Sequence, residues 1–393
     1  MAAQGVSSTN SVSFGVGCFT FEVPDEDHML MFSPGTYSVH DWARDVEAAL
    51  RELPSLDSIE VDGFRSVRGD SPPSWRNELE RLIADGPHES THKYGDFQPH
   101  PSVGRIKFDV TIPTRTQEQV FNYVGSRVGA STVFSVDIHY DGGMPVAYIR
   151  PAAVEAQPST SVAVVREFLR SEFDSRLKDN KVKFAAMGPS PMWAEWSLRV
   201  APVTNGYAWE IDVDSTRPGY AAVEIIVDSS SAANLEVAFE SAKFSLSQTL
   251  ADFYHMIGEQ NMRRMRRRFI EVQIEALIKS DSRRWPLGWF HRLFRGSGKA
   301  NSLTLEILAG KLDEETPIER QDKAGPNSPI RHLDYFFSQQ ASAEGDSYLE
   351  NAHQIVSLLS TRYSHIVQVA SVIVASLIGG LAGAAITALV QLT

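Results

Sequence analysis

The stretch that most limits what this chain can fold into lies near its end. Residues 366–392 read IVQVASVIVASLIGGLAGAAITALVQL, which is 27 positions without a charged side chain. A helix of that length spans about 40 Å, whereas the hydrocarbon layer of a bilayer is about 30 Å thick. A buried helix of a soluble domain is typically shorter and has one polar face. The run therefore predicts one C-terminal transmembrane helix that crosses the bilayer once.

The flanks of this run predict how the chain lies at the membrane. Arg362 and His365 precede the run, and only Thr393 follows it. Since cations favour the cytoplasmic side, we expect a single-pass, tail-anchored membrane protein whose N-terminal part is cytoplasmic. The first residues lack the basic region and apolar stretch of a signal peptide. The single cysteine, Cys18, has no partner for an internal disulfide, which indicates a reducing compartment.

Small residues recur every four positions within the uncharged run. They are Ser371, Ala375, Gly379, Gly383 and Thr387. Small side chains at this spacing let two helix backbones approach closely in lipid. We expect this helix-packing face to form a homo-oligomer or to bind a partner helix. An anchor that is merely rich in alanine and glycine is the alternative, and the sequence leaves open whether the helix forms a pore.

A basic segment stands out in an otherwise acidic chain. The net charge of the whole chain is −12, but residues 262–299 hold eleven Lys and Arg against three Asp and Glu. Five of the cations surround an apolar stripe on a predicted helix: Arg263, Arg264, Arg266, Arg267 and Arg268. The second part mixes cations with aromatic rings: Arg283, Arg284, Trp285, Trp289, Arg292 and Arg295.

Three interpretations of this basic segment stay open. Aromatic rings and arginines together suit the surface of an anionic bilayer. The same composition suits a nucleic acid or a small anionic ligand such as a nucleotide, through phosphate contacts and stacking. A helix with an ordinary solvated basic face is the third. The predicted anchor favours the membrane surface, because tethering raises the local concentration of any surface-binding segment.

One motif suggests metal chemistry. His88, Glu89 and His92 match the His-Glu-x-x-His spacing, in which two histidines on one helical face bind zinc. Gln98 occupies the place where the extended motif has its third ligand, and Gly86 and Pro87 interrupt the chain just before the motif. We therefore prefer a polar loop here. A membrane-anchored zinc-dependent hydrolase is kept as the alternative, and zinc is then the cofactor.

Two predicted strands carry acidic residues at alternate positions. The two sets are Asp137, His139 and Asp141, and Glu210, Asp212 and Asp214. Alternation places each set on one sheet face. If the strands were neighbours, the carboxylates could bind Mg²⁺ or Ca²⁺, but a solvated face of an antiparallel sheet is the simpler interpretation.

The remaining patterns predict an α+β fold of antiparallel hairpins with packed helices. A hairpin turning at residues 141–143 and another at residues 217–219 are each followed by a helix. The second of these helices extends over about 234–280, which suggests a stalk, a coiled-coil contact or a break near Gly258. It is much longer than a typical globular helix.

Five regions follow from these patterns. They are an N-terminal α+β region over 1–130, a hairpin-helix-hairpin domain over 131–233, the long helix with its basic and aromatic segment over 234–299, a polar linker region over 300–350, and the juxtamembrane and transmembrane helix over 351–393.

Together these features suggest a sensor or effector that binds rather than catalyses. The cytosolic α+β part would bind a ligand or a protein partner, and the chain would signal to or act at the lipid bilayer.

Overall fold

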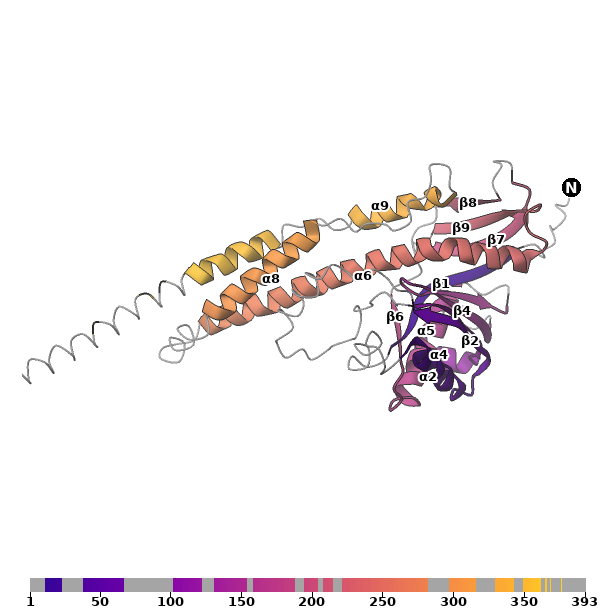
Figure 1. Cartoon of the computed structure of the whole chain (residues 1–393), viewed down its shortest axis with the longest axis horizontal. Coiled ribbons are helices and arrows are strands. Elements are labelled where there is room, and N and C mark those ends of the chain that lie inside the picture. Colours follow the sequence, from indigo (N-terminus) through magenta and orange to yellow (C-terminus); the bar gives the residue numbers. More distant parts are fainter. Residues whose placement is uncertain are drawn as a thin grey trace, which may run out of the picture. The chain divides into compact units, whose positions relative to one another are not determined.

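The computed structural model describes residues 11–22, 38–66, 102–121, 131–153, 158–187, 194–203, 208–214, 221–281, 297–315, 329–342 and 349–361, together with residues 365, 368 and 376. The chain forms two compact units. The sheet unit comprises Met1–Arg76, Ser90–Glu259 and Glu319–Ala343. The helical unit comprises Asn77–Glu89, Gln260–Ile318 and Glu344–Thr393. Figure 1 labels the elements of both units.

The sheet unit is built on one sheet that draws strands from both sides of residue 130. Its strands in spatial order are β2 (Leu56–Ser66), β3 (Ser102–Thr111), β4 (Val133–Asp141), β5 (Val146–Pro151), β1 (Ser11–Glu22), β7 (Ala194–Ala201), β9 (Ala221–Asp228) and β8 (Trp209–Asp214). A further strand, β6 (Lys183–Met187), pairs with β1.

The predicted α+β class is confirmed, and both predicted hairpins are present as the antiparallel pairs β4–β5 and β8–β9. The sheet as a whole is mixed, because β7 pairs with β9 in parallel. The second strand of the β8–β9 hairpin, and not the first, lies next to β7. Strand β9 runs antiparallel to β8 and in the same direction as β7.

Strand β1 pairs with three other strands along its length. Its residues Ser11–Phe14 pair with β7, Gly15–Gly17 with β5, and Cys18–Glu22 with β6. Most of β1 is buried, and its alternation is weak because both of its faces are covered. This strand therefore holds the first half of the sheet to the second.

Helix α2 (Val39–Arg51) covers one face of the sheet. It begins at a capping box in which the Ser38 hydroxyl accepts from the Asp41 N–H and the Asp41 carboxylate accepts from the Ser38 N–H. Trp42 is buried, and its indole Nε1 donates to the Phe21 carbonyl at 3.1 Å. The Trp42 ring packs edge-on against Phe64 and Tyr140.

Helix α5 (Pro158–Ser175) lies against β1 on the same core. Val162, Val165, Phe168 and Leu169 of this helix join the core cluster that α2 and the sheet form. The approach is close at Gly15, where a Cβ atom would collide with the Pro158 carbonyl oxygen and with Val162 Cγ2. The glycine therefore allows the helix to reach the strand.

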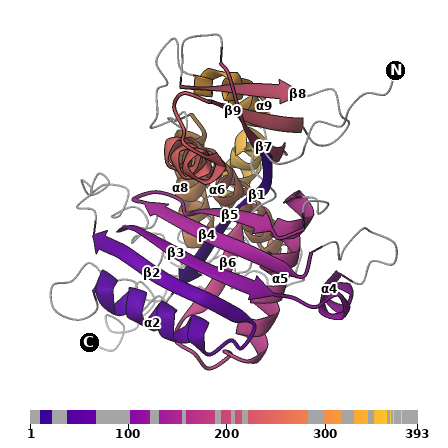
Figure 2. The same ribbon diagram turned by 90° about the vertical axis from the view of Figure 1, so that its right-hand side faces the viewer.

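Helix α6 (Leu235–Asp281) is a single helix of 47 residues, with no break at Gly258. Its bounds match the predicted 234–280. Its first half covers the sheet face opposite α2, which Figure 2 shows end-on. The sheet unit also contains α4 (Thr114–Phe121), the 3-10 helix η5 (Pro329–Leu333) and α9 (Asp334–Ser342), and η5 lies against β8.

The helical unit packs the second half of α6 with α8 (Ser297–Glu315) and with a helix over residues 349–361. Its core consists of Ile270, Ile274, Leu277, Ala300, Leu303, Ile307, Leu349, Ala352 and Val356. Lys311 forms an ion pair with Glu350, and the Ser360 hydroxyl donates to Asn301 Oδ1 at 3.1 Å. These two contacts show that α8 and the helix over 349–361 run antiparallel.

Candidate functional site

The first half of α6 docks on charged side chains of the sheet. Along β4 the residues Phe134, Val136, Ile138 and Tyr140 enter the apolar core, whereas Asp137 and His139 face α6 because side chains alternate along a strand. On the neighbouring strand β3, Arg105 lies opposite His139 in the register. The charged face predicted for β4 is present, but α6 covers Asp137 and His139 on it, whereas Asp141 at its end is exposed.

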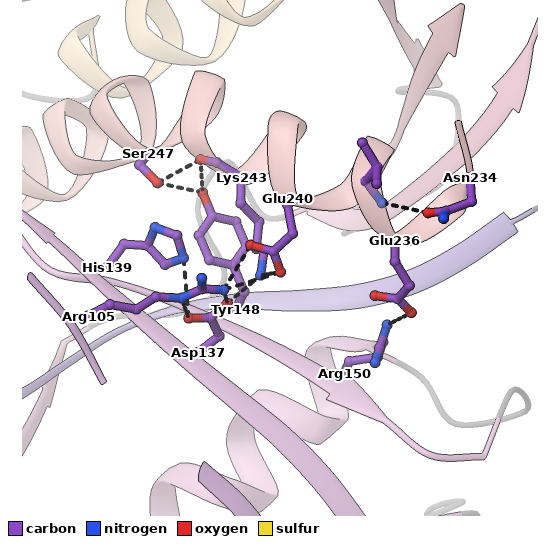
Figure 3. A network of polar contacts seen from close by, with 11 residues as sticks. Arg105, Asp137, His139, Tyr148, Arg150, Asn234, Glu236, Glu240, Lys243 and Ser247 are labelled. Atoms are coloured by element: carbon purple, nitrogen blue, oxygen red, sulfur yellow. Dashed lines mark hydrogen bonds and ion pairs between the residues drawn. The ribbon is translucent and has the colours of Figure 1, made fainter. Parts of the chain in front are cut away.

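Four charges meet in this interface (Figure 3). Arg105 Nε lies 2.5 Å from Asp137 Oδ1, and Arg105 Nη2 lies 2.9 Å from Glu240 Oε2. Lys243 Nζ forms an ion pair with Asp137 and lies 2.7 Å from Glu240 Oε1. Each cation therefore contacts both carboxylates. We call these four residues the docking network.

The surroundings of the docking network complete its hydrogen bonds. The hydroxyl of Tyr148 on β5 donates to the Lys243 carbonyl at 3.0 Å and lies 3.1 Å from the Ser247 hydroxyl. The Lys243 ammonium also lies 4.8 Å from the centre of the Phe239 ring, within range of a cation–π interaction. His139 Nε2 is 3.2 Å from Asp137 Oδ1.

Burial and charge act in opposite directions on the carboxyl groups. Lys243 is 2% exposed and Asp137 is 5% exposed. Burial by itself would raise the pKa of Asp137, but the Arg105 guanidinium, the His139 ring and, to a lesser degree, the Lys243 ammonium hold that pKa well below its usual range. Burial likewise opposes the shift at Glu240, where Lys243 and Arg105 lower the pKa. Asp137 raises the pKa of Arg105 in return.

This arrangement can hold a helix in one register more readily than it can catalyse a reaction. Two cations and two carboxylates balance one another, and each is engaged with a partner on the opposite element. A buried ion pair adds little net stability compared with an apolar contact, but breaking one partner leaves a buried charge. The best-attested use of such pairs is to specify register. We therefore assign the docking network to the placement of α6 on the sheet.

The docking network makes the stability of the folded protein depend on pH. Since the pKa values of Asp137 and Glu240 are lowered in the folded protein, their contribution to stability is complete above the unfolded pKa of about 4 and is lost as the pH falls below it. We expect the urea midpoint to fall between pH 5 and pH 2. The fall should be smaller in the double variant Asp137→Leu/Lys243→Met. An equal fall of the urea midpoint in both proteins would contradict the assignment of the docking network to the placement of α6.

No family model, curated protein or solved structure matches this chain. The function must therefore be argued from the residues themselves.

The structure places the first part of the basic segment on the second half of α6. Arg264 and Arg268 are exposed, Arg266 and Arg267 are half-buried, and Arg263 is buried. The exposed apolar side chains among them are Met262, Met265, Phe269 and Val272. We call Arg264, Arg268 and these four residues the arginine face. Arg263 does not belong to the arginine face because its side chain is buried. The sequence pattern predicted all five arginines together, since it does not distinguish the inner from the outer side of the helix.

Several predicted residues lie outside the described part of the chain. They are the second part of the basic segment, with Arg283, Arg284, Trp285, Trp289, Arg292 and Arg295; the helix-packing face, with Ser371, Ala375, Gly379, Gly383 and Thr387; and the motif residues His88, Glu89 and His92. Among the described residues, no helix is both long and apolar enough to cross a bilayer. Of residues 366–392, only Gln368 and Ser376 belong to the described part of the chain.

The two acidic strands do not form a joint metal site. Four strands separate β4 from β8 in the sheet, so the carboxylates of Asp137 and Asp212 cannot share an ion. Within the described ranges, no group of three or more His, Cys, Asp or Glu side chains is placed to hold a metal.

The docking network was not recognised from the sequence, although one signal was present. Lys243 falls on the apolar stripe that Phe239, Leu246 and Leu250 form at three-four spacing along α6. A lysine on a buried stripe needs an anionic partner. The order of strands in the sheet decides which strand supplies that partner. Sequence patterns of this kind do not predict the strand order.

Proposed function

We propose that this chain is a non-enzymatic membrane-associated sensor or effector, in which the arginine face of α6 binds anionic lipid headgroups. The observation that supports this most is the exposure of cations and apolar side chains together on one helix segment. Arg264 and Arg268 are exposed next to Met265, Phe269 and Val272, which are also exposed. Apolar side chains at the headgroup boundary, flanked by cations at the lipid phosphates, are typical of interfacial helices.

The uncharged run at residues 366–392 supports the same proposal. It follows the helix over 349–361, which packs in the same unit as the arginine face. A single transmembrane helix there would hold the helical unit at the bilayer and keep the arginine face close to the headgroups. The sheet unit would then stand in the cytoplasm, where it binds a ligand or a protein partner.

The test measures whether the arginine face enters the headgroup region. The full chain carrying Met265→Cys is labelled with an environment-sensitive fluorophore and reconstituted into vesicles of phosphatidylcholine with or without phosphatidylserine. The native Cys18 is buried and does not compete for the label. We expect a blue shift that requires phosphatidylserine, weakens with salt, and disappears in Arg264→Glu/Arg268→Glu.

Two controls separate a specific contact from a general charge effect. Phe244→Cys places the label at another exposed apolar position of α6, away from the arginines, and should give no shift. Arg44→Glu/Arg51→Glu reverses two exposed charges on α2 and should leave the shift unchanged. A shift that appears with a single-stranded oligonucleotide and not with anionic vesicles would overturn the lipid proposal in favour of nucleic-acid binding. Resistance of the full chain to extraction by carbonate tests the transmembrane helix separately.

A further inference from the structure

Helix α8 has apolar residues on two opposite sides. Ala300, Leu303 and Ile307 lie in the core of the helical unit. Leu305 and Leu312 are 68% and 64% exposed, and Leu308 is also exposed. At 100° per residue these three leucines lie on the side of α8 away from the core. A helix that is apolar on both sides is normally covered on both sides.

The outer leucines have the spacing of a helix–helix seam. Asn301, Leu305, Leu308 and Leu312 follow one another at intervals of four, three and four residues, as the a and d positions of a heptad do. The positions that flank this seam are Ser302, Thr304, Ala309 and Lys311. Three of these are uncharged, and Lys311 forms an ion pair with Glu350 of its own chain. We call the three leucines the outer seam.

The charge pattern indicates what covers the outer seam. Exposed arginines flank the apolar residues of α6, as an anionic surface requires, whereas an uncharged border and one neutralised lysine flank those of α8. Two copies of α8 can therefore face each other without bringing like charges together. A seam of this kind is self-complementary, as a two-fold interface must be.

We propose that a second copy of this chain packs against Leu305, Leu308 and Leu312, so that the two α8 helices form a parallel two-fold pair. The parallel direction rests on the proposed function, because two copies anchored by residues 366–392 in one bilayer point the same way. The seam is only about two heptads long, which is marginal for free chains. Tethering in the membrane raises the effective concentration of the second copy and makes a short seam sufficient.

The proposal is tested by disulfide formation across the two-fold axis. In a parallel pair each residue of the seam lies next to its own copy, so Leu305→Cys in the full chain should form a covalent dimer on mild oxidation in proteoliposomes. Lys299→Cys is the matched control, since Lys299 is exposed on the same helix but lies off the seam. Native Cys18 is buried and should not cross-link. Equal amounts of dimer for the two variants would overturn the proposal.

A second variant keeps the test independent of disulfide formation. Leu305→Glu/Leu308→Glu should lower the dimer fraction in nanodiscs, measured by energy transfer between labelled copies, while the phosphatidylserine-dependent shift of the arginine face stays unchanged. An unchanged dimer fraction would mean that α8 does not form the interface. If the dimer is lost and lipid binding never occurs even in the parent chain, the proposed function fails and the α8 pairing stands.

Discussion

Asp137→Asn is expected to lower the free energy of unfolding by about 3–5 kcal/mol. The substitution keeps the shape of the side chain but removes the negative charge that faces Lys243 and Arg105. Lys243 is almost fully buried, so its ammonium group would lose an anionic partner in a place that water cannot reach. Glu240 remains in contact with both cations but is only one of the two anions. Urea unfolding followed by circular dichroism measures the change.

The double variant Asp137→Leu/Lys243→Met decides whether this loss comes from the unpaired charge. It removes one cation and one anion together and leaves Arg105 paired with Glu240. Replacing a buried pair by apolar residues of similar size is often neutral. We therefore expect the double variant to be much more stable than the sum of its single variants predicts. Asp141→Asn on the same strand is the control, because Asp141 is exposed and should change stability by less than about 0.5 kcal/mol. If Asp137→Asn is as mild as this control, α6 is not held by the docking network.

Gly15→Ala should cost about 1–3 kcal/mol, as overpacking of a tight contact does. The added Cβ meets the carbonyl oxygen of Pro158, which is backbone and cannot rotate away, and Val162 Cγ2. Helix α5 must therefore move off β1, although alanine suits a strand no worse than glycine does. Thermal and urea unfolding both measure the loss.

Gly143→Ala is the matched control for this prediction. The nearest atom to a Cβ on Gly143 is Ala251 Cβ at 3.9 Å, which is an ordinary contact. This variant should be neutral within about 0.5 kcal/mol. Equal effects of the two substitutions would indicate that the cost comes from backbone conformation and not from the contact between α5 and β1.

Local elements of this fold were largely predictable, because their signals lie within short windows. The three-four spacing from Phe239 to Ile257 gives α6 its bounds, and the turn residues at 141–143 give the first hairpin.

Helix α8 was missed for a physical reason. The sequence predicted a polar linker region over 300–350, but a helix covers Ser297–Glu315. Because Leu303 and Ile307 face the core while Leu305 and Leu312 face outward, the apolar residues show no single stripe. An amphipathic period is visible only when one side of a helix is polar.

The docking network was beyond the sequence for a different reason. It joins β3, β4 and α6, which are separated by up to 135 positions between Arg105 and Glu240. Periodicity shows which side chains share a face, but it does not show which face is later covered. The charged side of β4 was therefore predicted to be solvated, and Asp137 is instead buried. Of the arginine face, the sequence identified the two arginines within a set of five, and the structure separated Arg264 and Arg268 from buried Arg263.

The pairing of β1 has a consequence for how the chain folds during synthesis. Its middle three residues pair with β5, but its first four pair with β7 and its last five with β6, so the set of its three partners is complete only at Ala201. At roughly 5–20 residues per second, this apolar strand waits on the order of 10–40 s for its partners. Such a delay exposes an edge that other nascent chains can join. A chaperone that holds early segments would therefore raise the yield of this protein more than one that acts on completed chains.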